Sequence, residues 1–270
     1  SLGAIPGDID MVVIAVPAPA VPQVLEESGR KGAKLAVIVS AGFRETGERG
    51  RVEEERLLEI ARTYGIRIVG PNSLGIMLPH RGINTTFDPV SAQPGYIGFV
   101  SQSGAIITTV VDWSITEGIG FSAVVSVGNQ TDLSFVDYLK FLEQDEQTRA
   151  IILYIEEIRN GREFMETVAG ISRKKPIIAL KAGSSTKGRE AAISHTGSLA
   201  GSYEVYMAAF RQTGVIPAFS LREAFNMAEV IAAEGYPGGR RAVIVTGAGG
   251  FAVLGSDYAE RFGIDLAVLP

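Results

Sequence analysis

The sequence contains no cysteine and only two histidines among its 270 residues. The absence of cysteine excludes a disulfide framework, thiolate zinc sites and a cysteine nucleophile, and it is compatible with a reducing cytosol. Two histidines are too few for a multi-histidine metal site, so we expect no metal centre. Positive charge is also scarce, since 25 Lys+Arg against 30 Asp+Glu give a net charge of −5. Nucleic acid is therefore not an expected partner.

The chain also lacks a long apolar run. The best one, from Met11 to Pro17, has the length of a strand, whereas a membrane helix needs about 18–20 apolar residues. The N-terminus has no basic region and carries Asp8 and Asp10 early, unlike a signal peptide. We therefore expect a soluble, cytoplasmic protein with no membrane partner.

What the sequence does contain is ordinary globular composition with an excess of glycine. Hydrophobic residues make up 46% and charged residues 20%, and there are 32 glycines. This composition excludes a disordered or fibrous chain, and the length suggests about two domains. The glycines indicate many tight turns and close backbone approaches.

Short apolar runs alternate with helix-length amphipathic segments along the chain. The runs are nearly all apolar rather than alternating, which is typical of strands buried on both faces of a parallel sheet. The expected strands are Met11–Val16, Leu35–Val39, Arg67–Val69, Ile97–Val100, Ala123–Val127, Ala150–Ile155, Pro176–Lys181, Ala242–Thr246 and a candidate at Ile264–Leu269. The expected helices are Val21–Arg30, Arg49–Tyr64, Ala105–Glu117, Leu133–Glu143, Gly161–Lys174, Gly201–Thr213, Ser220–Ala233 and Phe251–Phe262. This order predicts doubly wound α/β layers.

Two breaks divide this pattern. Pro79–Gly95 has no helical or strand periodicity and contains three prolines, so we expect a crossing loop or linker there. The second break is the turn-rich stretch Gly235–Gly239. The predicted domains are 1–94, 95–236 and 237–270. Only the middle one has a full set of elements, so we expect the first and third to be cut.

The strand ends carry the candidate chemistry, because open α/β sheets bind ligands there. The turn Ser101-Gln-Ser-Gly104 follows a strand and opens a helix, so it is a candidate anion site, or else its serines only cap the helix. The turn Thr246–Gly250 is a second candidate anion site, because it also follows a predicted strand and precedes a predicted helix. It is not the dinucleotide fingerprint, which disfavours a nicotinamide-dependent oxidoreductase.

One histidine and two carboxylates are candidates for nucleophilic chemistry. His195 stands in a Gly/Ser/Thr-rich loop and is either a nucleophile toward phosphorus or a structural or exposed residue. Glu156 and Glu157 follow a strand, and one of them could orient His195 unless both only flank the next helix. Alternation along an extended chain predicts that only one points into the crevice. His80 is expected to be a solvated surface residue.

Three further strand ends are built of proline, glycine and small polar residues. They are Pro17-Ala-Pro19, Ser40-Ala-Gly-Phe43 and Gly70–Gly75. Together they suit an extended, partly apolar ligand that lies along the backbone, although each alone could be a simple turn.

Several of these motifs together resemble one family. They are Val16–Pro19, Ser40–Phe43, Gly70–Gly75, Val100–Gly104, Ser126–Asn129, Tyr154–Glu156 and Ser194–Ser198, in this order. The set resembles the α subunit, or α part, of NDP-forming acyl-CoA synthetases over essentially the whole chain. The most similar type is the ADP-forming acetyl-CoA synthetase, a relative of succinyl-CoA synthetase.

The resemblance implies a fold and a reaction. The fold is an incomplete Rossmann-like CoA-binding domain, whose first βαβ unit has no counterpart here, then a flavodoxin-like doubly wound domain and the start of a second flavodoxin-like unit. The reaction is that of an acid–thiol ligase. Acyl-CoA and phosphate give acyl phosphate and CoA, the acyl phosphate phosphorylates a histidine, and the histidine loop swings to an ATP-grasp domain where ADP accepts the phosphoryl group.

The resemblance also assigns residues. His195 is the expected phosphorylated histidine and Glu156 the carboxylate that orients it. The expected phosphate-binding residues are Ser101, Gln102, Ser103, Gly104, Gly128, Asn129, Gly247, Gly249 and Gly250. The expected CoA-binding residues are Pro17, Pro19, Ser40, Ala41, Gly42, Phe43, Pro71, Asn72 and Ser73. Succinyl-CoA synthetases have cysteine where this chain has Ser73.

The expected partners are a small acyl substrate and an ATP-grasp β subunit or domain, which would bind ADP or ATP with Mg²⁺ because this chain has no such domain. A hetero-oligomer or fused homodimer follows from that division. The alternative is a catalytically inactive module that senses acyl-CoA or a nucleotide in a fused protein acetyltransferase. The presence of both His195 and Glu156 favours the enzyme, since a sensor has no chemical need for the pair.

Overall fold

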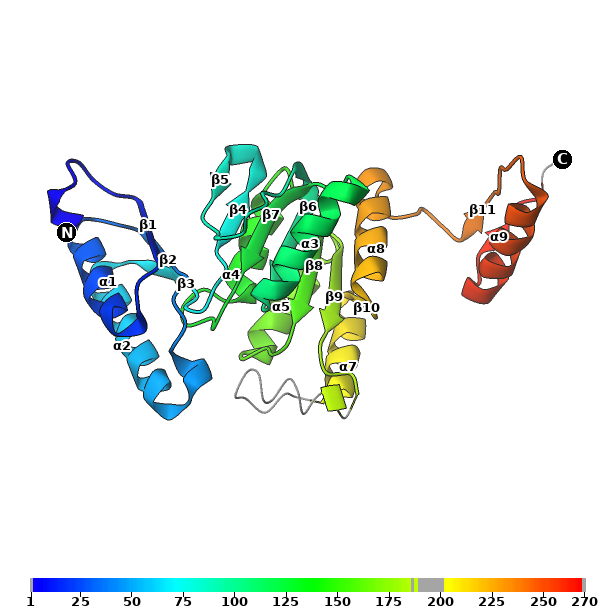
Figure 1. Cartoon of the computed structure of the whole chain (residues 1–270). Coiled ribbons are helices and arrows are strands. Elements are labelled where there is room, and N and C mark those ends of the chain that lie inside the picture. Colours follow the sequence, from blue (N-terminus) through cyan, green and yellow to red (C-terminus); the bar gives the residue numbers. More distant parts are fainter. Residues whose placement is uncertain (1, 186, 189–201, 269–270) are drawn as a thin grey trace. The chain divides into compact units, whose positions relative to one another are not determined.

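The structure is a computed structural model that describes residues 2–185, 187–188 and 202–268 (Figure 1). It consists of two compact units, residues 1–232 and residues 233–270. The first unit contains a parallel sheet and a larger, mostly parallel sheet, and the second unit contains one small sheet.

The amino-terminal sheet of the first unit has three parallel strands in the order β1 (Met11–Ile14), β2 (Leu35–Ile38) and β3 (Arg67–Val69). Short 3-10 turns at Leu2–Ala4, Ala18–Ala20 and Arg44–Thr46 accompany it, with α1 (Val21–Arg30) and α2 (Glu48–Tyr64). The two helices pack on each other at Gly29, where a Cβ atom would lie 2.4 Å from the Tyr64 ring. Only glycine permits this approach.

The second sheet has seven strands in the order β10-β9-β8-β6-β7-β4-β5. They are β4 (Ile76–Leu78), β5 (Ile83–Asn84), β6 (Pro94–Ser101), β7 (Phe121–Ser126), β8 (Ala150–Ile155), β9 (Ile177–Lys181) and β10 (Ile216–Ala218). Neighbouring strands are parallel, except that β4 runs antiparallel to both β7 and β5. Strands β7, β8 and β9 are almost wholly buried, as is β6 from Ile97 on, and their continuous apolar sequence predicts this.

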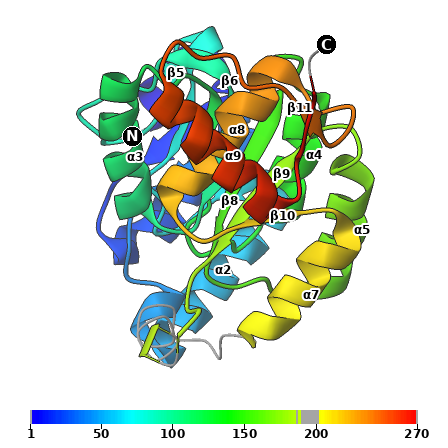
Figure 2. The same cartoon turned by 90° about the vertical axis from the view of Figure 1, so that its right-hand side faces the viewer.

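Helices cover both faces of this sheet. One apolar cluster joins it to α3 (Gly104–Glu117) and α8 (Leu221–Glu234). The other joins it to α4 (Phe135–Gln144), α5 (Gly161–Ile171) and α7 (Tyr203–Thr213), of which α5 and α7 lie side by side (Figure 2). The predicted doubly wound α/β fold is therefore confirmed.

The strand order reverses beside the central strand. From β6 the chain crosses to β7 on one side, and from β7 it returns to β8 on the other side of β6. The gap between the carboxyl ends of β6 and β8 is therefore the topological switch point, where open α/β sheets form their ligand crevice.

Three strands were not expected from the sequence. Strands β4, β5 and β10 have only two or three residues each, and Pro217 interrupts the apolar character of β10. Strand β5 lies in the stretch Pro79–Gly95, so the expectation of a structureless linker there is wrong in part. That stretch also holds a 3-10 turn at Pro79–Arg81 and the start of β6. Strands β4 and β5 precede the predicted domain boundary at 94/95, yet they pair with the second sheet.

The second unit is small. Strands β11 (Arg241–Ala242) and β12 (Asp265–Leu266) pair in parallel, and α9 (Gly249–Phe262) connects them. Both strands are shorter than predicted. Ala259 is the single buried residue of α9.

Candidate functional site

The turns after β1, β2 and β3 contact one another. The Ser40 hydroxyl donates to the Val16 carbonyl oxygen over 2.5 Å, and the Asn72 backbone N–H donates to the Ser40 carbonyl oxygen over 3.0 Å. Gly42 has a φ of +108°, and a Cβ there would lie 2.9 Å from the Ala18 Cβ atom. The structure thus brings together the three strand ends that were predicted to form one rim.

Two predicted rim residues point inward instead. The Phe43 side chain is fully buried in the core of the first sheet. Ser73 is also buried, and its hydroxyl donates to the Ser126 carbonyl oxygen over 2.6 Å. The Ser126 hydroxyl in turn accepts the Leu74 backbone N–H at 2.9 Å. Both side chains therefore hold the fold together and do not line the rim.

The turn between β6 and α3 is closed by its own serines. The Ser101 hydroxyl accepts the Ser103 backbone N–H at 3.1 Å and donates to the Ser103 carbonyl oxygen at 2.9 Å. Ser103 is the N-cap of α3, because its hydroxyl accepts the Ile106 backbone N–H at 3.3 Å. The capping alternative is therefore realised at Ser103, while Gly104 begins the helix.

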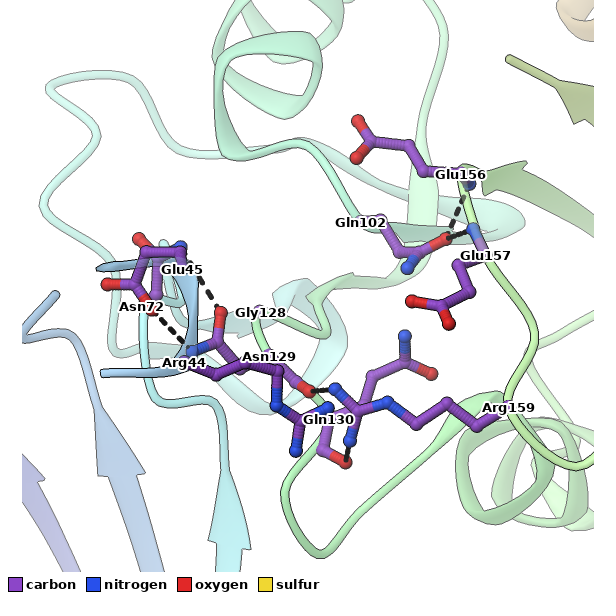
Figure 3. A pocket seen from close by; sticks show the side chains of 10 residues that line it. All are labelled: Arg44, Glu45, Asn72, Gln102, Gly128, Asn129, Gln130, Glu156, Glu157 and Arg159. Carbon is purple, nitrogen blue, oxygen red and sulfur yellow. Dashed lines mark hydrogen bonds between the residues drawn. The ribbon is translucent and has the colours of Figure 1, made fainter. Parts of the chain in front are cut away.

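Gln102 connects this turn to the next strand across the switch point. Its side-chain oxygen accepts two backbone N–H groups, from Glu156 at 2.5 Å and from Glu157 at 2.8 Å (Figure 3). Its own backbone N–H donates to the Tyr154 carbonyl oxygen at 3.2 Å. Since the oxygen is used in this way, the side-chain nitrogen faces the cavity. Gln102 therefore fixes the chain that carries the two glutamates.

Both Glu156 and Glu157 line a cavity that Gln102, Asn72 and Asn129 also line. The expectation that only one of them faces the crevice is wrong, because strand β8 ends at Ile155 and the alternation of an extended chain no longer applies beyond it. Glu156 is 9% exposed. The carboxylates of the pair lie in different directions from the backbone that Gln102 holds (Figure 3).

Asn129 joins the second sheet to the amino-terminal one. Its side-chain nitrogen donates to Glu45 at 2.6 Å and to Glu54 at 2.8 Å, and its side-chain oxygen accepts from the Asn72 side chain at 3.3 Å. Its backbone N–H donates to the Pro71 carbonyl oxygen at 2.8 Å. Its N–H groups are thus engaged by protein acceptors, so Asn129 is a joint between the sheets. The predicted phosphate contact of Asn129 stays a prediction.

Glycine is required next to that joint. Gly128 has a φ of +56°, and a Cβ at this position would lie 2.3 Å from the Pro71 carbonyl oxygen. The backbone of the two sheets can therefore approach this closely only at a residue without a side chain.

Glu45 accepts three hydrogen bonds at this joint. One of its oxygens accepts the backbone N–H groups of Gly42 at 2.5 Å and Phe43 at 3.1 Å, and the other accepts from Asn129. Burial acts to raise the pKa of Glu45, but the hydrogen bonds from Asn129 and the backbone outweigh it and the pKa is lowered. Glu54 is buried and forms an ion pair of 2.7 Å with Arg44.

Sequence reasoning missed Arg159, which lies four residues beyond the end of β8. Its guanidinium group donates to the carbonyl oxygens of Gln130, at 2.7 Å, and of Asn129 (Figure 3). No local pattern marks this arginine, because its acceptors come from another loop. The resulting cavity of about 60 Å³ is lined by Arg44, Glu45, Asn72, Gln102, Gly128, Asn129, Gln130, Glu156, Glu157 and Arg159.

The remaining predicted residues lie elsewhere. Gly247, Gly249 and Gly250 belong to the second unit, where α9 begins at Gly249. His195 lies outside the described residues. Within the described ranges, no three acidic or histidine side chains cluster as metal ligands would, and no helix could cross a membrane.

Comparisons with known proteins agree with this architecture. Residues 94–231 match the model of the succinyl-CoA ligase-like flavodoxin domain, and residues 1–79 match a CoA-binding domain. The acetate–CoA ligase (ADP-forming) I subunit alpha of Pyrococcus furiosus is 50% identical over 262 residues, which are 97% of this chain and 57% of that protein.

Two further relatives extend the likeness. The succinate–CoA ligase (ADP-forming) subunit alpha 1 of Archaeoglobus fulgidus is 30% identical over 76% of this chain and 70% of its own length. The structure of the dinucleotide-forming acetyl-coenzyme A synthetase 1 of Ca. Korarchaeum cryptofilum, in complex with phosphate and ADP, superimposes with a TM-score of 0.93 at 38% identity and covers 99% of this chain and 57% of that one. The chain thus spans 57% of the Pyrococcus relative and 57% of the structural relative. It belongs to the family of NDP-forming acyl-CoA synthetases that share the succinyl-CoA ligase-like flavodoxin domain.

Proposed function

We propose that this chain is the α part of an ADP-forming acyl-CoA synthetase of the acetyl-CoA type, which works through a phosphohistidine at His195. The observation that carries the proposal is the arrangement at the switch point. There Gln102 holds the backbone of Glu156 beside the amino terminus of α3. A carboxylate and a helix amino terminus at one crevice are the groups that a phosphorylated imidazole requires.

The reaction has three reversible steps. An oxygen of inorganic phosphate attacks the thioester carbonyl carbon of acyl-CoA, and the CoA thiolate leaves to give acyl phosphate. A ring nitrogen of His195 then attacks the phosphorus, and the acyl carboxylate leaves. Finally a terminal oxygen of ADP attacks the phosphohistidine, which forms ATP and restores the imidazole.

Glu156 serves the second step. Its carboxylate accepts the N–H of the ring nitrogen that does not react, which fixes the tautomer and stabilises the positive charge that develops on the ring. The amino terminus of α3, with Ser103 as its cap and Gly104 as its first residue, favours the negative phosphoryl group. The amide nitrogen of Gln102 adds a donor on the cavity side.

The rim of the three-stranded sheet is the proposed CoA site. Its small residues Pro17, Pro19, Ser40, Ala41 and Gly42 leave the backbone accessible, and Pro71 and Asn72 close the rim on the side of the cavity. The match of residues 1–79 to a CoA-binding domain supports this assignment.

ADP and its Mg²⁺ would be bound by an ATP-grasp domain or β subunit. Support comes from the Pyrococcus relative, of which this chain spans 57%, and from the structural relative, which was solved in complex with phosphate and ADP. A split active site of this kind requires a hetero-oligomer or a fused dimer, and the chain's second unit, with Gly247, Gly249 and Gly250, is proposed to belong to the phosphate surface that faces the partner.

Intact-mass measurement tests the proposal. The full-length protein is incubated with acetyl phosphate, which donates the phosphoryl group directly and needs neither CoA nor ADP. We expect one added phosphoryl group that is labile to acid and stable to base, absent from His195→Ala and retained in the matched control His80→Ala. An unmodified wild-type protein would contradict the proposal and favour a sensing module. A modified His195→Ala variant would contradict it by showing that another residue accepts the phosphoryl group.

A further inference from the structure

Gln130 has an uncommon backbone conformation at the cavity of the candidate site. Among the described residues, only two that are not glycine have a positive φ, Asn72 with +56° and Gln130 with +53°. Both line this cavity. Asparagine adopts the left-handed region more readily than most residues do, whereas glutamine has no such preference. Left-handed residues other than glycine are costly and cluster at functional sites, so Gln130 is a candidate for a role there.

Four hydrogen bonds hold this conformation. The guanidinium group of Arg159 donates to the carbonyl oxygen of Gln130 at 2.7 Å and to that of Asn129, so it engages the carbonyl groups on both sides of the Gln130 Cα atom. The Gln130 N–H donates to the Val127 carbonyl oxygen at 3.3 Å, and the N–H of the next residue donates to that of Gly70 at 3.2 Å. Every backbone group that flanks this Cα atom is therefore engaged, and surroundings that fix the backbone in this way allow a costly conformation to persist.

The side chain of Gln130 is buried and ends in the cavity. The residue is only 7% exposed, and within the described part of the chain no group hydrogen-bonds to its side-chain amide. In the view of Figure 3 this side chain lies between Glu157 and Arg159. An amide that is removed from water without a partner is costly. Glycine at this position would remove both this cost and that of the backbone, so the fold alone gives no reason for a glutamine.

The size and the chemistry of the cavity limit its occupant. Its volume of about 60 Å³ is far below the roughly 300 Å³ of a pocket for a drug-sized ligand, so a small group fits and a whole nucleotide does not. Glu156, Glu157 and Gln102 line the same cavity. A side-chain amide donates two hydrogen bonds without carrying a charge. It can therefore bind phosphoryl oxygens and leave the negative charge of Glu156 in place.

We propose that the side-chain amide of Gln130 contacts the phosphoryl group that is transferred to His195, and that Arg159 is the positioning residue that directs this amide into the cavity. The inference rests on the proposed function. In the step in which the imidazole nitrogen attacks phosphorus and the acyl carboxylate leaves, the amide donates its N–H groups to phosphoryl oxygens. These donors are preorganised, because the four backbone hydrogen bonds fix Gln130 before the substrate enters.

Glycine at this position separates the proposed role from a structural one. Gln130→Gly relieves the left-handed backbone, so the urea midpoint should rise. The second-order rate constant of phosphorylation by acetyl phosphate, followed by intact mass in the full-length protein, should fall roughly 10- to 100-fold, the effect of a hydrogen bond to a charged group. A residue that only supports the fold would move both measurements in the same direction. Gln147→Gly, in an exposed turn, is the matched control and should keep the wild-type rate.

A second variant keeps the bulk of the side chain. Gln130→Leu loses only the amide, so it should slow phosphorylation as much as Gln130→Gly without a gain in the urea midpoint. If Gln130→Gly does not fold, the rate of Gln130→Leu decides.

The outcomes separate this inference from the proposed function. A phosphorylated wild type, with either variant within twofold of its rate, overturns the role of Gln130 and leaves the proposed function standing. A urea midpoint below that of the wild type in both variants makes Gln130 a structural residue and also overturns the inference. An unphosphorylated wild type overturns both the inference and the proposed function.

A double-mutant cycle tests the positioning role of Arg159. Arg159→Met should slow phosphorylation about tenfold in the wild-type background, because the amide of Gln130 is no longer directed into the cavity, and such a coupling is usual for residues in contact. In the Gln130→Gly background the same substitution should change the rate by about twofold at most, since no amide remains to be placed. Equal factors in the two backgrounds would mean that Arg159 acts independently of Gln130 and would overturn its positioning role.

Discussion

Two strand–turn–helix segments of this protein look alike in sequence and differ in the structure. Ser101–Gly104 follows the eight-residue strand β6, and its residues contact the ends of neighbouring strands. Gly247–Gly250 lies beyond the two-residue strand β11 and is exposed, and Ala248, the N-cap of α9, makes no side-chain capping hydrogen bond. In the second turn the Thr246 hydroxyl accepts the Ala248 backbone N–H at 3.1 Å, a contact within the turn itself.

The difference lies in what adjacent strands add. A glycine-rich turn supplies free N–H groups in either place, and at the first turn residues that follow β8 and residues of the amino-terminal sheet line a cavity with Gln102. The first turn is therefore part of a cavity with carboxylates, amides and guanidinium groups, whereas the second is, within its own unit, a turn alone. Four predictions follow from this contrast and from the contacts at the first turn.

The largest effect is expected from Glu156→Gln. The variant keeps the size of the side chain and its backbone contacts with Gln102, but it loses the carboxylate that accepts the imidazole proton. Phosphorylation by acetyl phosphate should slow roughly 100-fold or more, within the usual range for acid–base groups. Single-turnover rates measure this, with Thr246→Val at the second turn as the control that keeps the wild-type rate. A Glu156→Gln rate within twofold of wild type would refute the role of the carboxylate.

The next effect is expected from Gln102→Leu. Two part-buried backbone N–H groups, of Glu156 and Glu157, lose their acceptor, which should lower the free energy of unfolding by about 2 kcal/mol and slow phosphorylation. Urea unfolding measures the stability. Gln147→Leu, at an exposed position, should change it by less than about 0.5 kcal/mol. Equal decreases in the free energy of unfolding of the two variants would show that the hydrogen bonds of Gln102 do not stabilise the fold.

A smaller effect is expected from removing the side-chain cap of α3 and introducing one at α9. Ser103→Ala removes the cap of α3 and should cost about 1 kcal/mol, while Ala248→Ser, at an extended residue with φ −119°, should stabilise α9 by a similar or smaller amount. Hydrogen exchange of the first-turn amides in each helix measures both changes. If Ala248→Ser does not protect the first-turn amides of α9, the lack of a capping side chain is not what leaves this helix end uncapped.

The smallest effect is expected on the stability at low pH. Because the pKa of Glu45 is lowered in the folded state below its ordinary value of 4.5, its contribution to stability is present above that pH and is lost as the pH falls through the folded-state pKa. Glu45→Gln should therefore flatten the acid dependence of the urea midpoint. The control is Glu48→Gln, an exposed residue that pairs with Arg51. Equal acid dependence in both variants would exclude Glu45 as an acid-sensitive link.

Much of the fold could be predicted because buried parallel strands are continuous apolar runs, and Ala150–Ile155 agrees with its prediction to the residue. Short strands such as β10 were not predicted, because a three-residue segment has no recognisable pattern of its own and becomes a strand by pairing with a neighbour. The strand-end rule located Gln102 and Glu156. It could not find Arg159, whose hydrogen-bond acceptors come from another loop, and it did not foresee that Ser73 and Phe43 would point inward.

The contact of Glu45 with Gly42 and Phe43 has a consequence for ligand binding. Two successive backbone N–H groups that share one oxygen form a small anion nest, and here the protein's own carboxylate fills it. An external anion that takes this nest must evict Glu45, and the exchange leaves the charge of the turn balanced. The eviction also releases the other oxygen of Glu45 from the Asn129 amide. An anion bound at the amino-terminal rim would therefore remove a hydrogen bond at the wall of the cavity, since the same Glu45 side chain makes both contacts.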